Sequence, residues 1–344
     1  MVIDTESRVT IVEVAARSGV SSATVSRVIN GDVHVRPATR ERVLRVMHDL
    51  GYIANRQARS LAGGRTDIIG LIVPDLGTGY IGEIIRGIDI ELGQTGLDLI
   101  LYTTHRTASK EANYVANLAQ GMVDGLVLVL PRSPADYIEA LTRRRFPFVL
   151  VDHQGTGRDC PAVGATNWRG AYDATEFLIQ LGHTRIGIIT GSMDLGCSQD
   201  RLAGYRAALQ DHQLPALPEL EYEGAFLQPD GYAGGSAFLD LSDPPSAIFA
   251  SNDVMAMGVM DAVRNRGLRI PDDISVVGFD NIPQSAVVYP PLTTVQQPLE
   301  DMGRAATQML LRILKRPEEN AGRVELPTRL VTRGSTSAPK GRAG

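Results

Sequence analysis

Apolar residues three and four positions apart organise the first part of the chain into short helices. The spacing predicts helices over Ile11–Ser18, Ser22–Asn30 and Pro37–Leu50. Gly19 separates the first two and suits a left-handed residue after a helix end. Two short helices joined by a glycine-containing turn form a helix-turn-helix, although any small three-helix bundle needs the same apolar pattern.

Local capping signals support the first two predicted helices. Thr10 and Glu13 have the spacing of a capping box, in which the threonine hydroxyl accepts from the Glu13 amide and the Glu13 side chain reaches back to the Thr10 amide. Ser21 stands where it can cap the second helix. The apolar face of that helix leaves Ser22, Ala23, Ser26 and Arg27 pointing outward.

From Asp67 onward the pattern changes to short apolar strands that alternate with amphipathic helices. This alternation is typical of parallel sheets and predicts an α/β core of two Rossmann-like lobes behind an all-α head. The predicted strands are Ile68–Val73, Leu97–Tyr102, Leu126–Leu130, Phe148–Val151 and Val163–Ala165, then Ile186–Thr190, Ala247–Ala250 and Ser275–Phe279. Two late strands, Thr293–Gln296 and Leu326–Thr332, are expected to return to the first lobe.

The charge of the chain follows the same division. The net charge is −5, from 34 basic and 39 acidic residues in 344. Up to Arg65 the sequence holds ten arginines and six acids, which gives +4, so the remainder is −9. A basic head on an acidic body is typical of a nucleic-acid-binding module joined to a separate domain.

Composition narrows the setting further. A chain of this length predicts two to three domains, and no run of about 18 apolar residues predicts a membrane span. The first ten residues lack the apolar region of a secretory signal. Cys160 and Cys197 have no metal-like spacing and fit a reducing cytosol, so we expect a cytoplasmic protein with no metal.

One glycine motif offers an enzymatic alternative. Gly77 to Gly82 reads GTGYIG, the spacing of a dinucleotide-binding fingerprint. However, Pro74-Asp75-Leu76 separates it from the preceding strand, and the next strand ends without an acid for a ribose. No metalloprotease, serine-hydrolase or P-loop motif is present, and the six histidines do not cluster. We therefore expect no catalytic residues, no cofactor and no enzyme.

At the level of longer strings, the sequence closely resembles the LacI/GalR family of bacterial transcriptional regulators from about Val9 to Thr332. The strings that carry the resemblance are VTI at 9–11, VA at 14–15, GVS at 19–21, TVSRVIN at 24–30, TR at 39–40, LGYIAN at 50–55 and ARSL at 58–61. The resemblance implies a DNA-binding head over residues 1–54, a hinge helix and linker over 55–66, and a periplasmic-binding-protein-like core over 67–334. A flexible tail is expected over 335–344.

The resemblance also implies a set of DNA contacts. Arg27 has the length and fork for a phosphate or a guanine, and Leu61 in the hinge would wedge between bases in the minor groove. The full expected set is Thr10, Ser21, Ser22, Ala23, Thr24, Ser26, Arg27, Asn30, His34, Thr39, Tyr52, Asn55, Ala58 and Leu61.

Polar residues at predicted strand ends form the second candidate site. Carboxylates, amides and an arginine grip hydroxyl groups, and an aromatic stacks on the apolar face of a sugar. Residues of these types fall at family effector positions: Tyr80, Asp152, Arg201, Phe226, Asn252, Asp280 and Gln297. Asp253 is expected to cap the helix that starts at Val254, and His183 to be a satisfied structural histidine. In the family, the stretch at 77–82 commonly carries paired aromatic residues that line the effector pocket, and here only Tyr80 is present.

These expectations combine into one function. We expect a homodimeric repressor that binds a near-palindromic DNA operator, with a small-molecule effector, a carbohydrate by resemblance, between the lobes. The alternatives are a solute-binding protein without a DNA role and a nicotinamide-dependent enzyme.

Overall fold

The computed structural model describes residues 9–29, 32–52, 65–132, 134–153, 160–318 and 321–340. These residues form two compact units that divide between Thr66 and Asp67, which is where the sequence changes from helical to α/β patterning. Among the described residues, no helix is long and apolar enough to cross a membrane.

The first unit is a bundle of three helices, α1 (Ile11–Ser18), α2 (Ser22–Ile29) and α3 (Pro37–Asp49). The Thr10 hydroxyl accepts from the Glu13 amide at 3.3 Å, and Gly19 ends α1 with φ +62°. The Ser21 hydroxyl accepts from the Thr24 amide at 3.2 Å. The predicted caps and turn are therefore present. The bundle closes on a small core of Val14, Ala15, Val25, Val28 and Val43.

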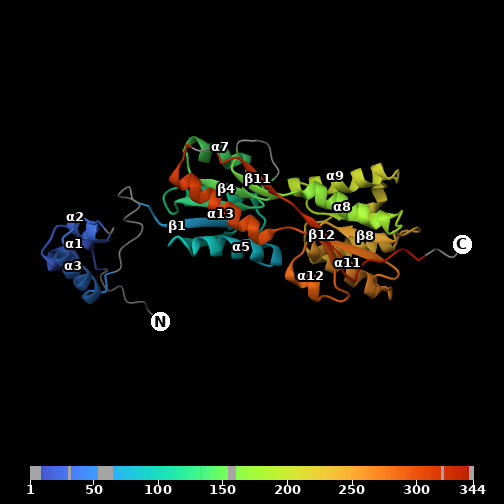
Figure 1. The fold of residues 1–344 in the computed structure, drawn as a ribbon, viewed down its shortest axis with the longest axis horizontal. Helices are drawn as coiled ribbons and strands as arrows, with labels where there is room; N and C mark the ends of the chain where they lie inside the picture. The colour runs from blue at the N-terminus through green and yellow to red at the C-terminus, as the bar shows by residue number, and fades with distance from the viewer. Residues whose placement is uncertain are drawn as a thin grey trace. The chain divides into compact units, whose positions relative to one another are not determined.

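The second unit begins with lobe 1, a six-stranded parallel sheet covered by helices on both faces (Figure 1). Its strands in spatial order are β11 (Arg323–Leu326), β5 (Ala162–Ala165), β4 (Phe148–Val151), β3 (Gly125–Val129), β1 (Ile68–Val73) and β2 (Asp98–Thr103). On one face lie α5 (Gly79–Leu92) and α13 (Leu299–Lys315), and on the other α6 (Ala108–Leu118) and α7 (Ala135–Arg143).

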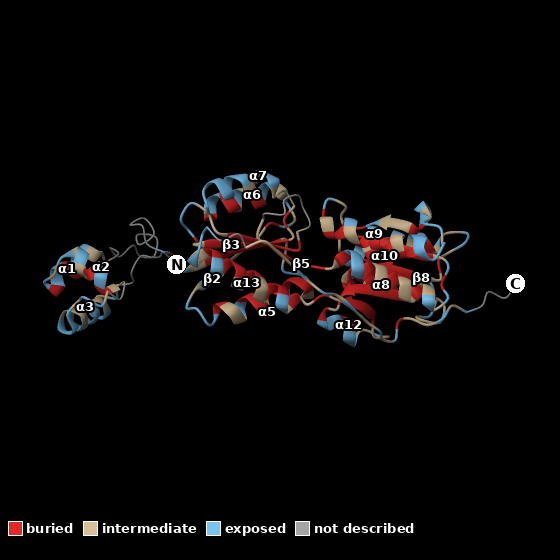
Figure 2. Cartoon of the chain, turned by 45° about the horizontal axis from the view of Figure 1, so that its top comes forward, coloured by how far each residue is buried: buried red, intermediate tan, exposed pale blue. Residues whose placement is uncertain are grey.

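Helices α5 and α13 pack against each other across two glycines. A side chain at Gly87 would collide with the α13 backbone at Glu300, and one at Gly303 with the α5 backbone at Ile84. The two helices come this close because neither glycine carries a Cβ. Together they close the apolar face of lobe 1 (Figure 2).

Lobe 2 repeats the three-layer arrangement. Its strands in spatial order are β12 (Arg329–Val331), β10 (Thr293–Gln296), β9 (Ser275–Asp280), β8 (Ala247–Ala250), β6 (Ile186–Thr190) and β7 (Glu221–Glu223). All pairs are parallel except β10 with β12. Helices α8 (Asn167–Gln180) and α9 (Gly196–Asp211) cover one face, and α10 (Gln228–Leu239) and α11 (Asp253–Asn265) the other. The short α12 (Pro283–Val287) follows β9.

The chain passes between the lobes three times, and here the sequence prediction was wrong. Thr293–Gln296 stays in lobe 2 as β10, and the expected single strand Leu326–Thr332 is split into β11 in lobe 1 and β12 in lobe 2. The prediction assigned these strands by chain order, whereas their pairing partners are decided by the crossings. Thr166 and Thr328, on two of the crossings, share a hydroxyl hydrogen bond of 2.9 Å.

The expected flexible tail also needs correction. Ser335 is fully buried, and its hydroxyl accepts from the Thr293 amide at 2.8 Å while donating to the Val276 carbonyl. His183 is buried as expected, with one ring nitrogen on the Ser246 hydroxyl and the other on the Ser337 carbonyl. Residues 335–340 therefore pack on lobe 2, because their polar groups complete hydrogen bonds at the amino ends of β9 and β10.

Candidate functional site

A cavity lies between the two lobes of the second unit, at the carboxyl ends of the parallel strands. The volume that the centre of a water molecule can occupy in this cavity is about 50 Å³. Loops at strand ends supply most of the wall, as expected for ligand sites in parallel sheets. The lining residues are Pro74, Asp75, Thr78, Tyr80, Ile81, Arg106, Leu130, Arg132, Asp152, Leu195, Cys197, Arg201, Phe226, Asn252 and Asp280.

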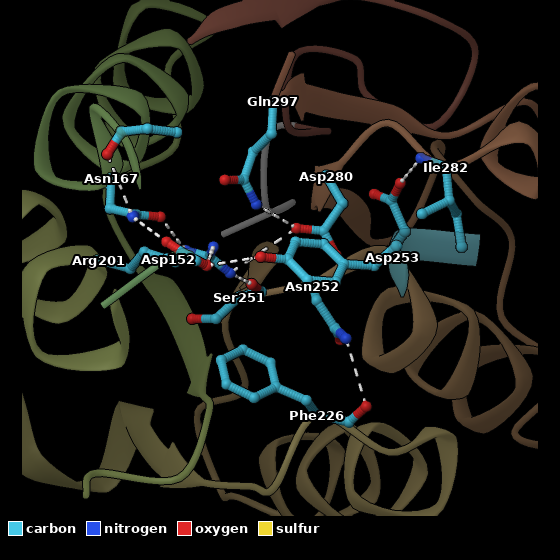
Figure 3. A network of polar contacts seen from close by, with 12 residues as sticks. Asp152, Asn167, Arg201, Phe226, Ser251, Asn252, Asp253, Asp280, Ile282 and Gln297 are labelled. Atoms are coloured by element: carbon cyan, nitrogen blue, oxygen red, sulfur yellow. Dashed lines mark hydrogen bonds and ion pairs between the residues drawn. The ribbon is translucent and has the colours of Figure 1, made fainter. Parts of the chain in front are cut away.

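Arg201 is the central cation of this cavity and is 2% exposed. Its guanidinium stands 4.0 Å from the carboxylate of Asp152, on lobe 1, and 3.9 Å from that of Asp280, on lobe 2 (Figure 3). It donates to the Asn167 side chain at 2.8 Å and to the Ser251 carbonyl. These bonds fix the guanidinium, which would be costly to bury without partners.

Two phenylalanines hold the same guanidinium from its faces. The Arg201 carbon lies 3.9 Å from the ring centre of Phe279 and 5.7 Å from that of Phe226. A side chain at Gly191 would overlap the Phe226 ring, so the glycine makes room for the aromatic. Phe226 therefore presents its ring at the cavity, as a stacking residue must.

The carboxylates are held by neutral donors as well as by the arginine. Asp152 accepts from the Tyr80 hydroxyl at 2.8 Å and from the Asn167 amide at 3.1 Å. Asp280 accepts from the Gln297 amide at 2.7 Å. Gln297 lies behind Asp280 rather than on the cavity wall, and its Oε1 atom is buried with no hydrogen-bond partner among the described residues.

Burial dominates the electrostatics of Asp280. It raises the pKa of this carboxyl to about 7, while Arg201 and the Gln297 hydrogen bond act in the opposite direction. Burial and the nearby Asp280 charge raise the pKa of Asp253 well above its usual value. Each of the three arginines that line the cavity lies beside a carboxylate: Arg106 by Asp75, Arg132 by Asp194, and Arg201 between Asp152 and Asp280. Since these cations are already paired, a neutral ligand that exchanges hydrogen bonds is favoured over an anion.

Strained backbone gathers at the same place. Ten non-glycine residues in the described part of the chain have positive φ. Five of them line the cavity, namely Arg106, Leu130, Asp152, Phe226 and Asp280. Such conformations cost on the order of 1–3 kcal/mol each and persist where the surroundings force them, commonly at ligand sites.

Six of the seven residues that the sequence analysis expected at the effector site line the cavity, and Gln297 supports one of them. Asp253 is not the helix cap that the sequence predicted. Asn252 caps α11 by accepting from the Met255 amide, and Asp253 accepts from Ile282 and Thr294. Both Asn252 groups are engaged, since its amide also donates to the Phe226 carbonyl.

Five polar residues of the site, Asp75, Thr78, Arg106, Arg132 and Asn167, were not predicted from the sequence. Asn167 joins Asp152 to Arg201 and follows β5, so the strand-end argument used for Asp152 would have found it. Asp75, Arg106 and Arg132 line the wall from lobe 1. Asp75 also follows a strand, but the sequence argument treated it only as part of the segment between that strand and the glycine motif. The two arginines have no sequence signal, because they act across the gap between the lobes.

The head presents the other candidate surface. Along α2, Val25 and Val28 are buried while Ala23 and Arg27 are exposed, and the Arg27 side chain is 68% exposed. Thr10, Ser21 and His34 are exposed, and Ser22, Thr24, Ser26, Thr39 and Tyr52 are partly exposed. Asn30, Asn55, Ala58 and Leu61 lie outside the described residues.

Comparison with known proteins identifies both units. Residues 10–55 match the model of the bacterial regulatory proteins of the lacI family, and residues 175–336 match the periplasmic binding protein-like domain. Catabolite control protein A of Priestia megaterium is 33% identical over 329 residues, which is 95% of this chain and 99% of the relative.

The chain belongs to the LacI family. Among solved structures, a lac repressor dimer bound to operator and the anti-inducer ONPF is 31% identical with a TM-score of 0.83, covering 96% of this chain and 99% of that one. A complex of the transcriptional regulator CelR with cellobiose is 32% identical with a TM-score of 0.74, covering 95% and 100%. The LacI-family head and the two-lobed core predicted from the sequence are thus confirmed.

Proposed function

We propose that this protein is a cytoplasmic transcriptional repressor whose affinity for a DNA operator is controlled by a small, uncharged carbohydrate bound between the core lobes. The observation that carries the proposal is the presence, in one chain, of a helix-turn-helix with an outward Arg27 and a core cavity lined by charged and aromatic side chains. Two similar structures contain such ligands: the lac repressor dimer is bound to operator and ONPF, and CelR is in complex with cellobiose.

The DNA role follows from the exposed face of α2. A recognition helix contacts base edges with the side chains near its start, here the small Ser22 and Ala23. With small residues at these positions, Arg27 supplies the strongest group for a phosphate or a guanine. The proposed hinge residues Asn55, Ala58 and Leu61 would add minor-groove contacts.

A homodimer is part of the proposal. A two-fold dimer places two heads on two half-sites and so requires a near-palindromic operator. Val287 and Tyr289 on lobe 2 are 81% and 84% exposed, which is unusual for apolar side chains and suits contact with a second copy. Dimerisation is measured by sedimentation of the full chain and of a Val287→Asp, Tyr289→Asp variant, which we expect to be monomeric.

A carbohydrate suits the cavity chemistry. Asp152 and Asp280 accept hydrogen bonds from hydroxyl groups, and Arg201 donates to them. Phe226 offers a face for the apolar side of a sugar ring. The two carboxylates disfavour a phosphorylated effector. Effector binding changes operator affinity, and by linkage the operator changes effector affinity by the same factor.

Two experiments test the proposal. Binding of the full chain to DNA from upstream of its own gene is measured at increasing salt. With 6–10 phosphate contacts we expect the affinity to fall about 10³–10⁵-fold between 50 and 200 mM salt. No binding, or binding that ignores salt, would remove the DNA role and favour a solute-binding protein.

The effector is sought by thermal shift with neutral sugars, sugar phosphates and nucleosides. We expect a neutral sugar to stabilise the wild type and the control Asp211→Asn, and to lose its effect in Asp280→Asn. A hit that is unaffected by Asp280→Asn would contradict the assignment of the cavity.

A further inference from the structure

Two arginines of lobe 1 that line the cavity make contacts with lobe 2. The Arg132 guanidinium lies 2.7 Å from the carboxylate of Asp194, which belongs to the loop after β6. Arg106 is held by the Asp75 carboxylate at 2.8–2.9 Å and donates to the carbonyl of Ala225, immediately before Phe226. Both arginines line the cavity, so both contacts between the lobes border it.

The Arg132 loop is fixed from inside lobe 1. Glu111, on α6, is 4% exposed and accepts the Arg132 backbone amide with both carboxylate oxygens at 3.2 Å. The Tyr137 hydroxyl, on α7, donates to Glu111 at 2.7 Å. A buried carboxylate is costly unless such donors satisfy it, so the loop amide and the tyrosine hold each other in register. These contacts of Glu111 are made outside the strands of the lobe 1 sheet.

We propose that Arg132 and Asp194 form a charged gate over the cavity, and that Glu111 and Tyr137 are positioning residues that aim Arg132 across the gap. The gate opens when the lobes part, and it thereby sets how readily the cavity exchanges its contents. The identity of the bound molecule as an effector rests on the proposed function. The existence of the gate does not depend on it.

Cys197 supplies a probe that needs no identified effector. Its thiol lines the cavity, is 1% exposed and lies three residues after Asp194. Burial raises its pKa, so the closed protein holds an unreactive thiol. Iodoacetamide is therefore expected to modify Cys197 only when the cavity opens. Cys160, outside the cavity lining, serves as the reference in the same sample.

The experiment measures the rate of Cys197 modification in the full chain by peptide mass spectrometry. Partly exposed ion pairs contribute up to about 1 kcal/mol, so we expect Arg132→Ala and Asp194→Ala each to speed modification about two- to five-fold. High salt should speed the wild type and leave Arg132→Ala unchanged. The exchanged pair, Arg132→Asp with Asp194→Arg, should bring the rate back toward the wild type.

A matched control removes another ion pair of lobe 1. Arg143 and Glu139 are paired at 2.6 Å within α7, away from the cavity. Arg143→Ala should leave the Cys197 rate unchanged. Equal Cys197 rates in Arg132→Ala, Arg143→Ala and the wild type would overturn the gate.

Tyr137→Phe tests the positioning role. Removing the hydroxyl should speed Cys197 modification and reduce its response to salt, as in Arg132→Ala. A lower melting temperature with the wild-type salt response would mean that Tyr137 and Glu111 only stabilise lobe 1.

The gate and the proposed function can fail separately. A failed sugar screen with gate-dependent Cys197 rates would remove the effector and keep the gate. A successful screen with gate-independent rates would do the reverse.

Discussion

The head and the core use polar groups in opposite ways. In the head, the described candidate contacts are exposed or partly exposed on one short bundle, and its core is five small apolar side chains. In the core, Asp152, Arg201 and Asp280 are all at most 3% exposed and come from separate strand ends and a helix. A surface that meets DNA keeps its charges in water until binding, whereas the cavity must satisfy its charges within the fold.

The comparison implies that a charge removed from the core affects stability far more than one removed from the head. Arg201→Ala leaves two buried carboxylates without their cation and should destabilise the core by about 3–5 kcal/mol. Trp168, the single tryptophan, lies on α8 in the core, so its fluorescence during urea unfolding reports this loss.

Arg206→Ala is the matched control for Arg201. Arg206 lies on the same helix in a surface pair with Glu221 and is 52% exposed. We expect a change below about 1 kcal/mol. Equal destabilisation by the two substitutions would contradict the buried network.

The converse change in the head should affect function and not stability. Arg27→Ala removes an exposed side chain, so the Trp168 unfolding curve should stay unchanged. Operator affinity should fall about 10–100-fold, the range for one specific arginine contact. Mobility shift at fixed salt measures it. Arg169→Ala removes an exposed charge from the core instead and should leave DNA binding near the wild-type level.

The pH response should also separate the units. Asp280 takes up its proton at about pH 7 when folded and near pH 4 when unfolded. Between these values the folded state binds more protons, so stability falls as pH rises, by up to about 1.4 kcal/mol per pH unit for this group. The Trp168 transition should weaken from pH 5 to 7 in the wild type and weaken less in Asp280→Asn. Parallel pH profiles would show that Asp280 is ionised throughout.

The smallest expected effect belongs to the head. Thr10→Ala removes the cap of α1 and should destabilise that helix by about 1 kcal/mol, seen as faster amide exchange over residues 11–18. The Trp168 transition should not move. Thr107→Ala, at the start of α6, is a fitting control because that threonine makes no cap bond to its helix.

Sequence alone went furthest where the physics is local. The hydroxyl cap that Thr10 gives α1, the turn at Gly19 and the strand-end placement of Asp152 and Asp280 depend on neighbours within a few residues. Each was predicted and each is found in the structure. His183 was also anticipated as a satisfied histidine.

The tertiary structure decided what depends on partners far along the chain. The lobe to which β10 and β12 belong follows from three crossings, and the packing of Ser335 follows from open backbone groups at the amino ends of β9 and β10. Arg132 meets Asp194 only because two loops 62 positions apart face each other across the cavity. Apolar periodicity records which side of an element is buried but not which element covers it. The sequence therefore determined the two units and most of the predicted cavity residues, and the tertiary structure alone determined which residues meet between the lobes.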